Sequence, residues 1–196
     1  SCPNNLLVNP SFENVTGSKN SINDNIPANW VHSGGGEIGV TTGFSPPDGI
    51  YVGYVWTKPS GSPATMYQAV SAIPNNTYQL TFYSGTHNPA VQPTVAIRFY
   101  NGSNTEVGTP AIHTITKDID GSTLGGPYTL NATAPANAAT MRVIFTDPSS
   151  SGSGAGAKGD ALCLRNTTPD PTGQIGDRVW YDLDSQGDQG GNEVGI

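Results

Sequence analysis

Charged side chains are scarce in this 196-residue chain, at 12% of the residues, and only eight of them are Lys or Arg. Binding of nucleic acid needs clustered cations to neutralise phosphates, and these eight are scattered through a chain with a net charge of −7. No apolar run reaches the length of a membrane-spanning helix. We therefore expect neither a nucleic-acid partner nor a membrane-spanning segment.

The common catalytic motifs are also missing. The chain contains no G-x-S-x-G elbow, no H-E-x-x-H, no Cys/His pair and no phosphate-cradling loop. Its Asp and Glu residues are scattered and mark no pair of carboxylates of the kind that hydrolyses glycosides. The sequence therefore predicts a protein that is not an enzyme.

A helical period is absent as well, and turn-forming residues are abundant, with 25 Gly and 16 Pro. Short runs rich in Val, Ile, Tyr, Phe and Thr alternate with Gly, Pro, Asn and Ser, which is typical of strands and turns. Asn101-Gly102 reads as a hairpin turn. The pattern predicts an all-β fold, an antiparallel β-sandwich of the jelly-roll type. The expected strands are Leu6–Val8, Ser11–Glu13, Trp30–Val31, Glu37–Thr41, Tyr51–Trp56, Ala64–Val70, Tyr78–Ser84, Thr94–Tyr100, one or two strands within Glu106–Thr116, Tyr128–Ala132, Thr140–Thr146 and Asp160–Leu164.

The two cysteines, Cys2 and Cys163, lie at opposite ends of the expected sandwich. This placement favours a disulfide that joins the first strand to the last, in a secreted protein; two unrelated buried thiols are the alternative. A disulfide that closes a loop of this length would contribute about 5 kcal/mol to the stability of the folded state in the chain-entropy model. The start at Ser1-Cys2-Pro3 is what cleavage of a secretion signal, or trimming of a longer chain, leaves.

Alternation within two strands predicts which side chains face outward. Tyr78, Leu80 and Phe82 share the core face of one strand, and Val95, Ile97 and Phe99 that of another. We expect their neighbours Tyr83, Arg98 and Tyr100 to share one outer face. Rings beside planar hydrogen-bonding groups suit a sugar-binding sheet. Ordinary pairing between strands on a solvated sheet is the alternative.

Three segments carry a resemblance to a known group of folds. They are Asn5–Glu13 with Pro27-x-x-Trp30, then Gln68-Ala69-Val70 with Asn76–Phe82, and finally Gly159–Leu164. In this order they resemble the galactose-binding-like jelly rolls, which include several families of carbohydrate-binding modules. The resemblance covers residues 4 to 164 and implies a sandwich domain over residues 1–166.

The resemblance also implies a structural calcium where the first and last strands meet. Glu13 and Asp160 match the carboxylate ligands, and carbonyl groups of the Ser33–Gly36 loop would complete an oxygen shell. Ala161 departs from the pattern, because many relatives carry a second Asp there. The alternative is that Glu13 caps a turn and that Asp160 is a solvated residue at a strand end.

Ligand contacts vary among such modules, and two locations stay open. A concave sheet would use Tyr83, Arg98 and Tyr100, whereas a loop edge would use Trp56, His87 and Asn88. Trp56 precedes Lys58-Pro59-Ser60-Gly61, where an indole could form an exposed platform. Trp30, beside Pro27, is expected in the core.

A second domain is expected after a linker that contains two prolines, at residues 167–172. Gly173–Asp182 resembles the first strand of the B-type domains of SdrD-type bacterial surface adhesins. The segment that follows matches an EF-hand-like calcium loop, with Gly187 at its bend. The expected ligands are Asp182, Asp184, Gln186, Asp188 and Glu193. The alternative is an acidic tail without metal. Residues 173–196 are too short to form a complete β domain, so we expect a truncated second domain with further domains after Ile196.

Taken together, these features predict a non-catalytic, calcium-binding module that is secreted or held at the cell surface. One interpretation is a glycan-binding or adhesive head of a multidomain bacterial surface protein. The alternatives are an architectural spacer and an accessory carbohydrate-binding module of a secreted polysaccharide-degrading enzyme.

Overall fold

The computed structural model describes residues 2–16, 25–57, 62–119, 123–148 and 156–169. The predicted second domain at 173–196, including its calcium loop, lies outside these residues, as do residues 170–172 of the predicted linker. None of the helices in the described ranges is long and apolar enough to cross a membrane.

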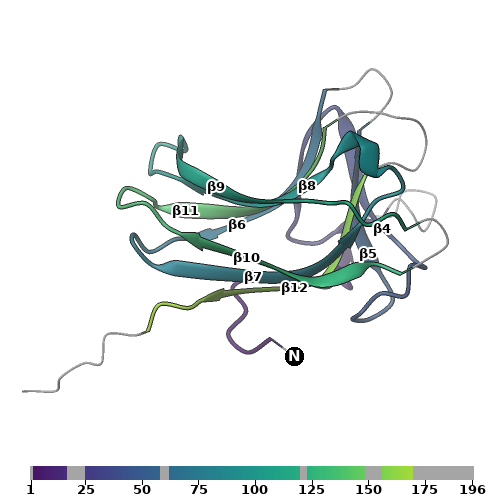
Figure 1. Cartoon of the computed structure of the whole chain (residues 1–196), viewed down its shortest axis with the longest axis horizontal. Helices are drawn as coiled ribbons and strands as arrows, with labels where there is room; N and C mark the ends of the chain where they lie inside the picture. Colours follow the sequence, from purple (N-terminus) through teal and green to yellow (C-terminus); the bar gives the residue numbers. More distant parts are fainter. Residues whose placement is uncertain (1, 17–24, 58–61, 120–122, 149–155, 170–196) are drawn as a thin grey trace, which may run out of the picture.

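Antiparallel strands form almost all of the regular structure (Figure 1). The described residues contain a two-stranded sheet, β1-β2, and two five-stranded sheets with the orders β10-β7-β12-β5-β4 and β3-β6-β11-β8-β9. A 3₁₀ turn, η2 (Pro89–Val91), precedes β8. The strands are β1 (Val15–Thr16), β2 (Ile26–Pro27), β3 (Val31–Gly34), β4 (Gly36–Thr41), β5 (Val52–Thr57), β6 (Ala64–Ser71), β7 (Thr77–Gly85), β8 (Thr94–Tyr100), β9 (Glu106–Thr114), β10 (Gly125–Thr133), β11 (Thr140–Asp147) and β12 (Ala157–Asn166).

The predicted all-β sandwich is confirmed, and its two sheets are consistent with a jelly roll. Ten of the predicted strands correspond to β3 to β12, with bounds shifted by a few residues. The predicted hairpin turn also joins β8 to β9, where the Asn101 N–H donates to the Thr105 carbonyl at 2.9 Å.

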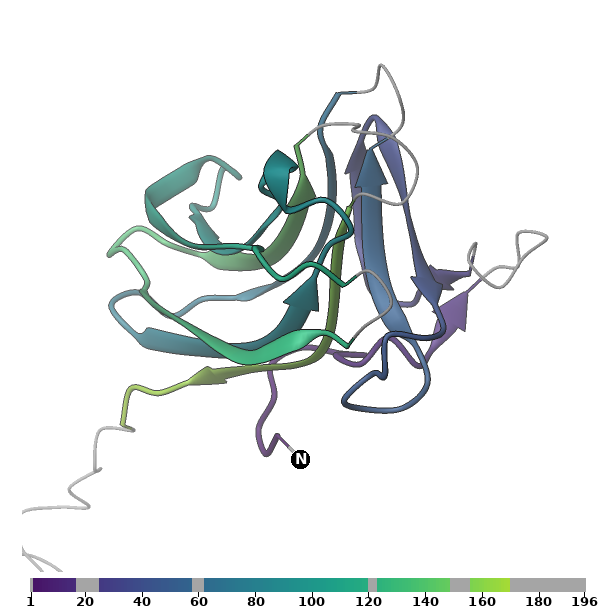
Figure 2. The same cartoon turned by 45° about the vertical axis from the view of Figure 1, so that its right-hand side comes forward.

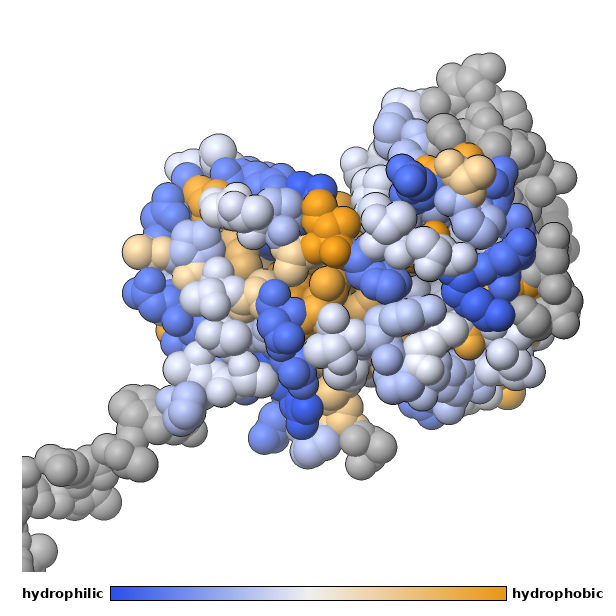
Figure 3. Space-filling model, viewed as in Figure 1, coloured by the Kyte–Doolittle hydropathy of each residue, from blue (hydrophilic) through white to orange (hydrophobic). Residues whose placement is uncertain are grey.

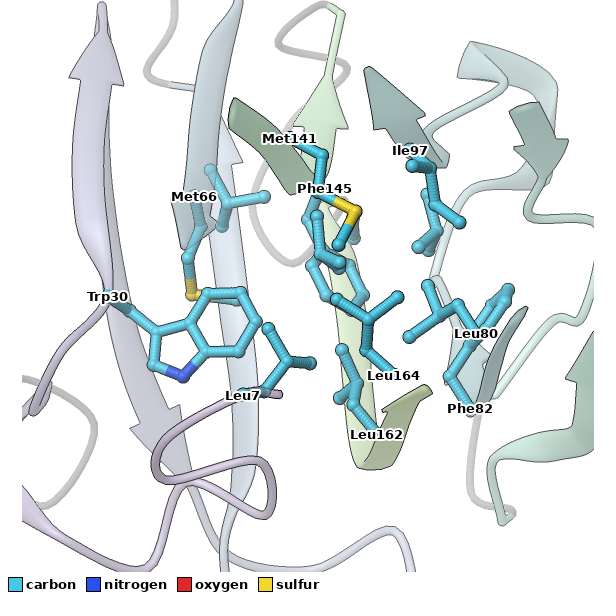
Figure 4. Close-up of a cluster of buried hydrophobic side chains, with 14 of the residues drawn as sticks. Leu7, Trp30, Met66, Leu80, Phe82, Ile97, Met141, Phe145, Leu162 and Leu164 are labelled. Carbon is cyan, nitrogen blue, oxygen red and sulfur yellow. The ribbon is translucent and has the colours of Figure 1, made fainter. Parts of the chain in front are cut away.

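The core lies between the two large sheets and follows the predicted alternation (Figure 4). The inward residues Leu80 and Phe82 of β7 and Val95 and Ile97 of β8 are all fully buried. Trp30 is in the core as expected, with 5% of its surface exposed. Apolar side chains remain visible in Figure 3 where the edge strands β9 and β10 face each other.

The N-terminal segment differs from the prediction, because Leu6–Val8 and Ser11–Glu13 do not form strands. Asn9 and Phe12 adopt left-handed backbone angles, with φ of 53° and 62°, which an extended strand does not allow. The Gln68 side chain takes the place of a neighbouring strand. Its Oε1 accepts from the Val8 N–H at 2.7 Å, and its Nε2 donates to the Val8 carbonyl at 2.8 Å.

The predicted disulfide between Cys2 and Cys163 is present, with a Cα–Cα distance of 5.7 Å. It joins the irregular N-terminal segment, rather than a first strand, to β12. Asn5 reinforces the same attachment, because its side chain donates to the Leu162 carbonyl and accepts from the Leu164 N–H. The N-terminal segment is therefore fastened along β12.

Both large sheets bend in the same direction (Figures 1 and 2). The sheet β3-β6-β11-β8-β9 lies on the inner side of the bend, so its outer surface is the concave face of the molecule. The outer surface of β10-β7-β12-β5-β4 is the convex face. These two faces are where a ligand could meet the sheets.

Candidate functional site

The antiparallel register arranges the side chains of the concave face in rows that cross the strands. One row is apolar and runs through the middle of the sheet: Val31, Tyr67, Ile144, Ala96 and Ile112. The next row toward the start of β6 carries a hydroxyl group on every strand: Ser33, Thr65, Thr146, Thr94 and Thr114. Ile144 and Ala96 are buried, so the apolar surface of this row comes from Val31, Tyr67 and Ile112. Apolar side chains beside hydroxyl groups match the two kinds of surface that a sugar ring presents.

Arg142 of β11 lies on the other side of the apolar row. Its guanidinium carbon is 4.7 Å from the ring centre of Tyr67 and 4.0 Å from that of Tyr100. Its Nη2 donates to the side-chain oxygen of Asn104, at 2.6 Å, in the turn between β8 and β9. Cation–π contacts with two rings and a hydrogen bond hold this guanidinium in a defined position.

Arg98 of β8 is the direct cross-strand partner of Arg142 in the register. Its Nη1 forms an ion pair with Glu106 of β9 at 2.7 Å. The concave face thus places two arginines side by side, next to two tyrosines and a strip of aliphatic and hydroxyl side chains. Such a surface can stack on a pyranose and can donate several hydrogen bonds to its oxygens.

The structure separates the residues that the sequence assigned to one ligand surface. Arg98 and Tyr100 lie on the concave face, but Tyr83 belongs to β7, whose sheet forms the convex face. The expectation of one shared face is wrong, because β7 and β8 alternate correctly but belong to different sheets. Alternation within a strand shows which side chains face the core and which face outward. It does not show to which sheet the strand belongs.

Trp56 and His87, the candidates at the loop edge, are also away from the concave face. Trp56 is on β5 opposite Glu37 of β4, in the convex sheet, and is half-buried with its indole nitrogen inaccessible. The His87 ring contacts Phe44 edge-on, with the ring centres 5.3 Å apart. Because its nitrogen is inaccessible to solvent, the Trp56 indole is less exposed than a stacking platform for a sugar ring needs.

Two residues of the concave face were missed by sequence reasoning, namely Tyr67 and Arg142. Both occupy outward positions in strands whose alternation is regular, Met66-Tyr67-Gln68 and Met141-Arg142-Val143, so their direction could have been derived. Their proximity could not, because it depends on β6 and β8 both pairing with β11.

Tyr83 lines a hollow of about 750 Å³ on the convex side. Arg165 and Thr81 line it from the sheet, and the disulfide lies in its wall. Tyr83 also packs against a small buried cluster that contains Val52, Ile119 and Leu124. This packing gives the ring a structural role, so the hollow is the weaker of the two locations.

Three carboxylates meet near the start of β12, where the resemblance implied a calcium. Asp160 is fully buried, and its Oδ2 accepts from the Asp48 N–H at 3.0 Å. Its Oδ1 is buried without a hydrogen-bond partner. Burial raises the pKa of Asp160 to about 7, and the charges of Asp48 and Glu13 also favour its protonated form.

Glu13 and Asp48 are held in this cluster by the chain between β4 and β5. The Glu13 Oε1 accepts from the N–H groups of Ile50 and Tyr51, at 2.9 and 2.8 Å. Gly49, with a φ of 76°, approaches so closely that a side chain there would collide with the Glu13 carboxylate. Asp48 accepts from the Ser11 hydroxyl at 2.6 Å.

Carboxylate oxygens are the ligand type that a hard cation such as Ca²⁺ prefers, and one oxygen of Asp160 is buried without a hydrogen-bond partner near Asp48 and Glu13. In the described part of the chain, no three His, Cys, Asp or Glu side chains form a ready-made metal group, so main-chain or water oxygens would have to complete the shell. The expected contribution of the Ser33–Gly36 loop is wrong. That segment packs against Trp56, Ser62 and Pro63, and residues 48–50 take its place at the cluster.

A β-sandwich with an exposed concave sheet is the architecture of many carbohydrate-binding modules. Residues 39–150, more than half of the chain, match the family described as "Domain of unknown function (DUF7850)", and the chain belongs to this family. No curated protein matches the chain.

Solved structures with a similar fold include the enzymatically active domain of tailspike protein 4 from bacteriophage CBA120, at 22% identity and a TM-score of 0.60 over 83% of this chain. The chain spans only 21% of that protein. A family 16 carbohydrate-binding module matches over its whole length and 83% of this chain, at 19% identity and a TM-score of 0.56. The CBM22-1 xylan-binding domain of Paenibacillus barcinonensis Xyn10C matches with 12% identity and a TM-score of 0.51, over 82% of this chain and 93% of that domain. At these identities the likeness is one of fold.

Proposed function

We propose that this chain is a non-catalytic glycan-binding module that binds a polysaccharide across its concave face. The observation that carries the proposal is the contact of the Arg142 guanidinium with Tyr67, which belongs to the apolar row of that face, and with Tyr100. The similarity to carbohydrate-binding modules supports the proposal at the level of fold.

The rows of the concave face suggest how a glycan would lie. Tyr67 and the exposed ends of the apolar row, Val31 and Ile112, offer apolar surface for the C–H face of a sugar ring, whereas Ile144 and Ala96 between them are buried. The threonine row on one side and the arginines on the other can donate to ring and hydroxyl oxygens. Such an arrangement binds by shape and hydrogen bonding and requires no reacting group.

We propose further that Asp160, Asp48 and Glu13 hold a structural Ca²⁺. A divalent cation would satisfy the buried Asp160 oxygen and offset the repulsion between three nearby carboxylates. It would fix residues 48–50 against the N-terminal segment and β12. This role is structural and lies apart from the proposed ligand face, because these elements belong to the convex side.

The wider setting stays part of the proposal. The disulfide is compatible with a secreted or cell-surface location. The calcium loop predicted from Asp182 to Glu193 would continue the chain as a calcium-binding adhesin of a bacterial surface. An accessory module of a polysaccharide-degrading enzyme is the second candidate, because similar folds occur in a tailspike's enzymatically active domain and in a xylan-binding domain of Xyn10C.

Polysaccharide binding measured by affinity electrophoresis and by glycan array tests the proposal. We expect binding by the wild type and a loss of at least about tenfold for Tyr67→Ala, a 1.4 kcal/mol effect. Tyr83→Ala on the convex face serves as the matched control and retains binding. If Tyr83→Ala loses binding and Tyr67→Ala does not, the ligand occupies the convex hollow instead. If no glycan binds at all, an architectural role replaces the proposal.

A further inference from the structure

The charge of the concave face is opposite to that of the chain. The chain carries a net charge of −7, with eight Lys and Arg against fifteen Asp and Glu. Arg98 and Arg142 nevertheless lie side by side on this face. Within the described residues, Glu106 is the one acidic residue that the register places there. The ligand face is therefore locally basic on an acidic protein.

Like charges directly opposite each other on neighbouring strands destabilise a sheet. Glu106 neutralises Arg98, to which it is paired at 2.7 Å. Arg142 has no carboxylate partner in the described part of the chain, and its contacts are neutral: Asn104, Tyr67 and Tyr100. The pair therefore keeps one positive charge that the described protein does not neutralise.

The same contacts hold the guanidinium of Arg142 in place. Two tyrosine rings lie within 4.7 Å of its central carbon, and Asn104 accepts from Nη2. Its Nε is buried without an acceptor, so only its Nη groups are left to donate to a ligand. A positioned and uncompensated guanidinium is suited to a planar oxyanion, which it binds through charge-assisted hydrogen bonds.

We propose that the concave face selects acidic glycans and binds a carboxylate or sulfate group of the polysaccharide next to Arg142 and Arg98. This inference rests on the proposed glycan-binding function and specifies its ligand class. A uronic acid and a sulfated sugar share the required chemistry, because each presents oxyanion oxygens beside a pyranose ring.

A matched pair of ligands tests the selectivity. Oligogalacturonate is compared with its carboxyl-reduced form, which has the same backbone without charge, by titration calorimetry in low salt without divalent cations. A sulfated dextran oligosaccharide separates sulfate from carboxylate recognition. We expect at least about tenfold tighter binding of an anionic ligand than of the neutral one, and we expect the difference to shrink in about 0.5 M salt, which screens charges.

Arg142→Met and the convex-face variant Arg165→Met provide a matched pair of proteins, because each loses one arginine. Arg142→Met removes at least about tenfold in affinity for the anionic ligand, and Arg165→Met leaves it unchanged. The salt dependence of the wild type serves as a readout that needs no variant, should Arg142→Met fold poorly.

Equal affinity for the oligogalacturonate and its reduced form, with no salt dependence and no preference for the sulfated ligand, overturns this inference and leaves the proposed function standing. An absence of binding to any charged or neutral glycan overturns both. Binding that is lost in Arg165→Met and kept in Arg142→Met moves the anion site to the convex face and also overturns the inference.

Discussion

Tyr67 and Tyr100 reach the same guanidinium from strands on opposite sides of β11, with ring centres 4.7 and 4.0 Å from the central carbon of Arg142. Tyr100 is only 8% exposed although it points outward from the sheet, since Arg142 lies over its ring. The two rings therefore fix the arginine as well as shaping the face.

Replacing Tyr100 tests this arrangement. Tyr100→Ala frees Arg142, so we expect a stability loss of about 1–3 kcal/mol in urea unfolding, from lost burial and the lost cation–π contact. Glycan affinity falls with it. Tyr100→Phe keeps the ring, so we expect it to retain most of the stability and most of the glycan affinity. Equal losses of stability and affinity in Tyr100→Ala and Tyr100→Phe would show that the hydroxyl group, not the ring, matters.

The buried carboxylate of Asp160 predicts a dependence on pH in metal-free protein. Its folded pKa of about 7 lies above the ordinary value of 3.8. Below about pH 4 this carboxyl group is protonated in both the folded and the unfolded protein, and its contribution to stability is fully present. As the pH rises through about 7 the buried group must ionise, and the free energy of unfolding falls by roughly 2–4 kcal/mol. Melting temperatures of wild type and Asp160→Asn, compared from pH 4 to 8, measure this difference.

Ca²⁺ should restore the stability that the metal-free protein loses at high pH, when Asp160 is ionised. We expect Ca²⁺ at pH 8 to raise the melting temperature of the wild type by several degrees and to leave Asp160→Asn unchanged. Glu37→Gln on β4 is the control for removal of a carboxylate elsewhere, and it keeps the response. A calcium response that persists in Asp160→Asn would assign the metal to another part of the chain.

The disulfide is expected to contribute strongly to stability. Replacing both Cys2 and Cys163 by Ser removes a constraint that spans 161 residues, and we expect a loss of about 3–5 kcal/mol in urea unfolding. Reduction of the wild type by dithiothreitol gives an independent measurement of the same effect. A loss below about 1 kcal/mol by both routes would show that Asn5 and β12 hold the N-terminal segment without the disulfide.

Gln68 gives a separate test of how the N-terminal segment is held. Gln68→Met keeps the volume but leaves the N–H and carbonyl of Val8 without their partners, so we expect a cost of about 2–4 kcal/mol. Gln79→Met, at a half-buried outward position of β7 where the amide bonds only to the side chains of Asn131 and Arg165, is the control and costs less than about 1 kcal/mol. Similar costs for both variants would contradict the proposed substitution of a side chain for a strand.

Much of the fold could be predicted because its signals are local. Alternation in β7 and β8 gave the correct inward residues, and the two cysteines indicated a bridge that the structure contains. The N-terminal segment could not be predicted, because Leu6–Val8 has the composition of a strand while the hydrogen-bond partner of Val8 is the side chain of Gln68, 60 residues away.

The candidate site was only half predictable for a similar reason. Arg98 and Tyr100 were singled out correctly as outward residues of one strand. Grouping them with Tyr83 failed, and Arg142 and Tyr67 were missed, because sheet membership is set by pairings between distant segments. Asp48 was missed at the carboxylate cluster, since it lies 112 residues from Asp160 in sequence.

The ring signals of the eight tyrosines give the most direct test of where a glycan binds. NMR spectra are recorded on protein that is isotope-labelled at its tyrosine rings while an oligosaccharide that binds the protein is added. The chemical shifts of Tyr67 and Tyr100 should change, and that of Tyr83 should not. Shifts at Tyr83 with none at Tyr67 or Tyr100 would contradict binding on the concave face.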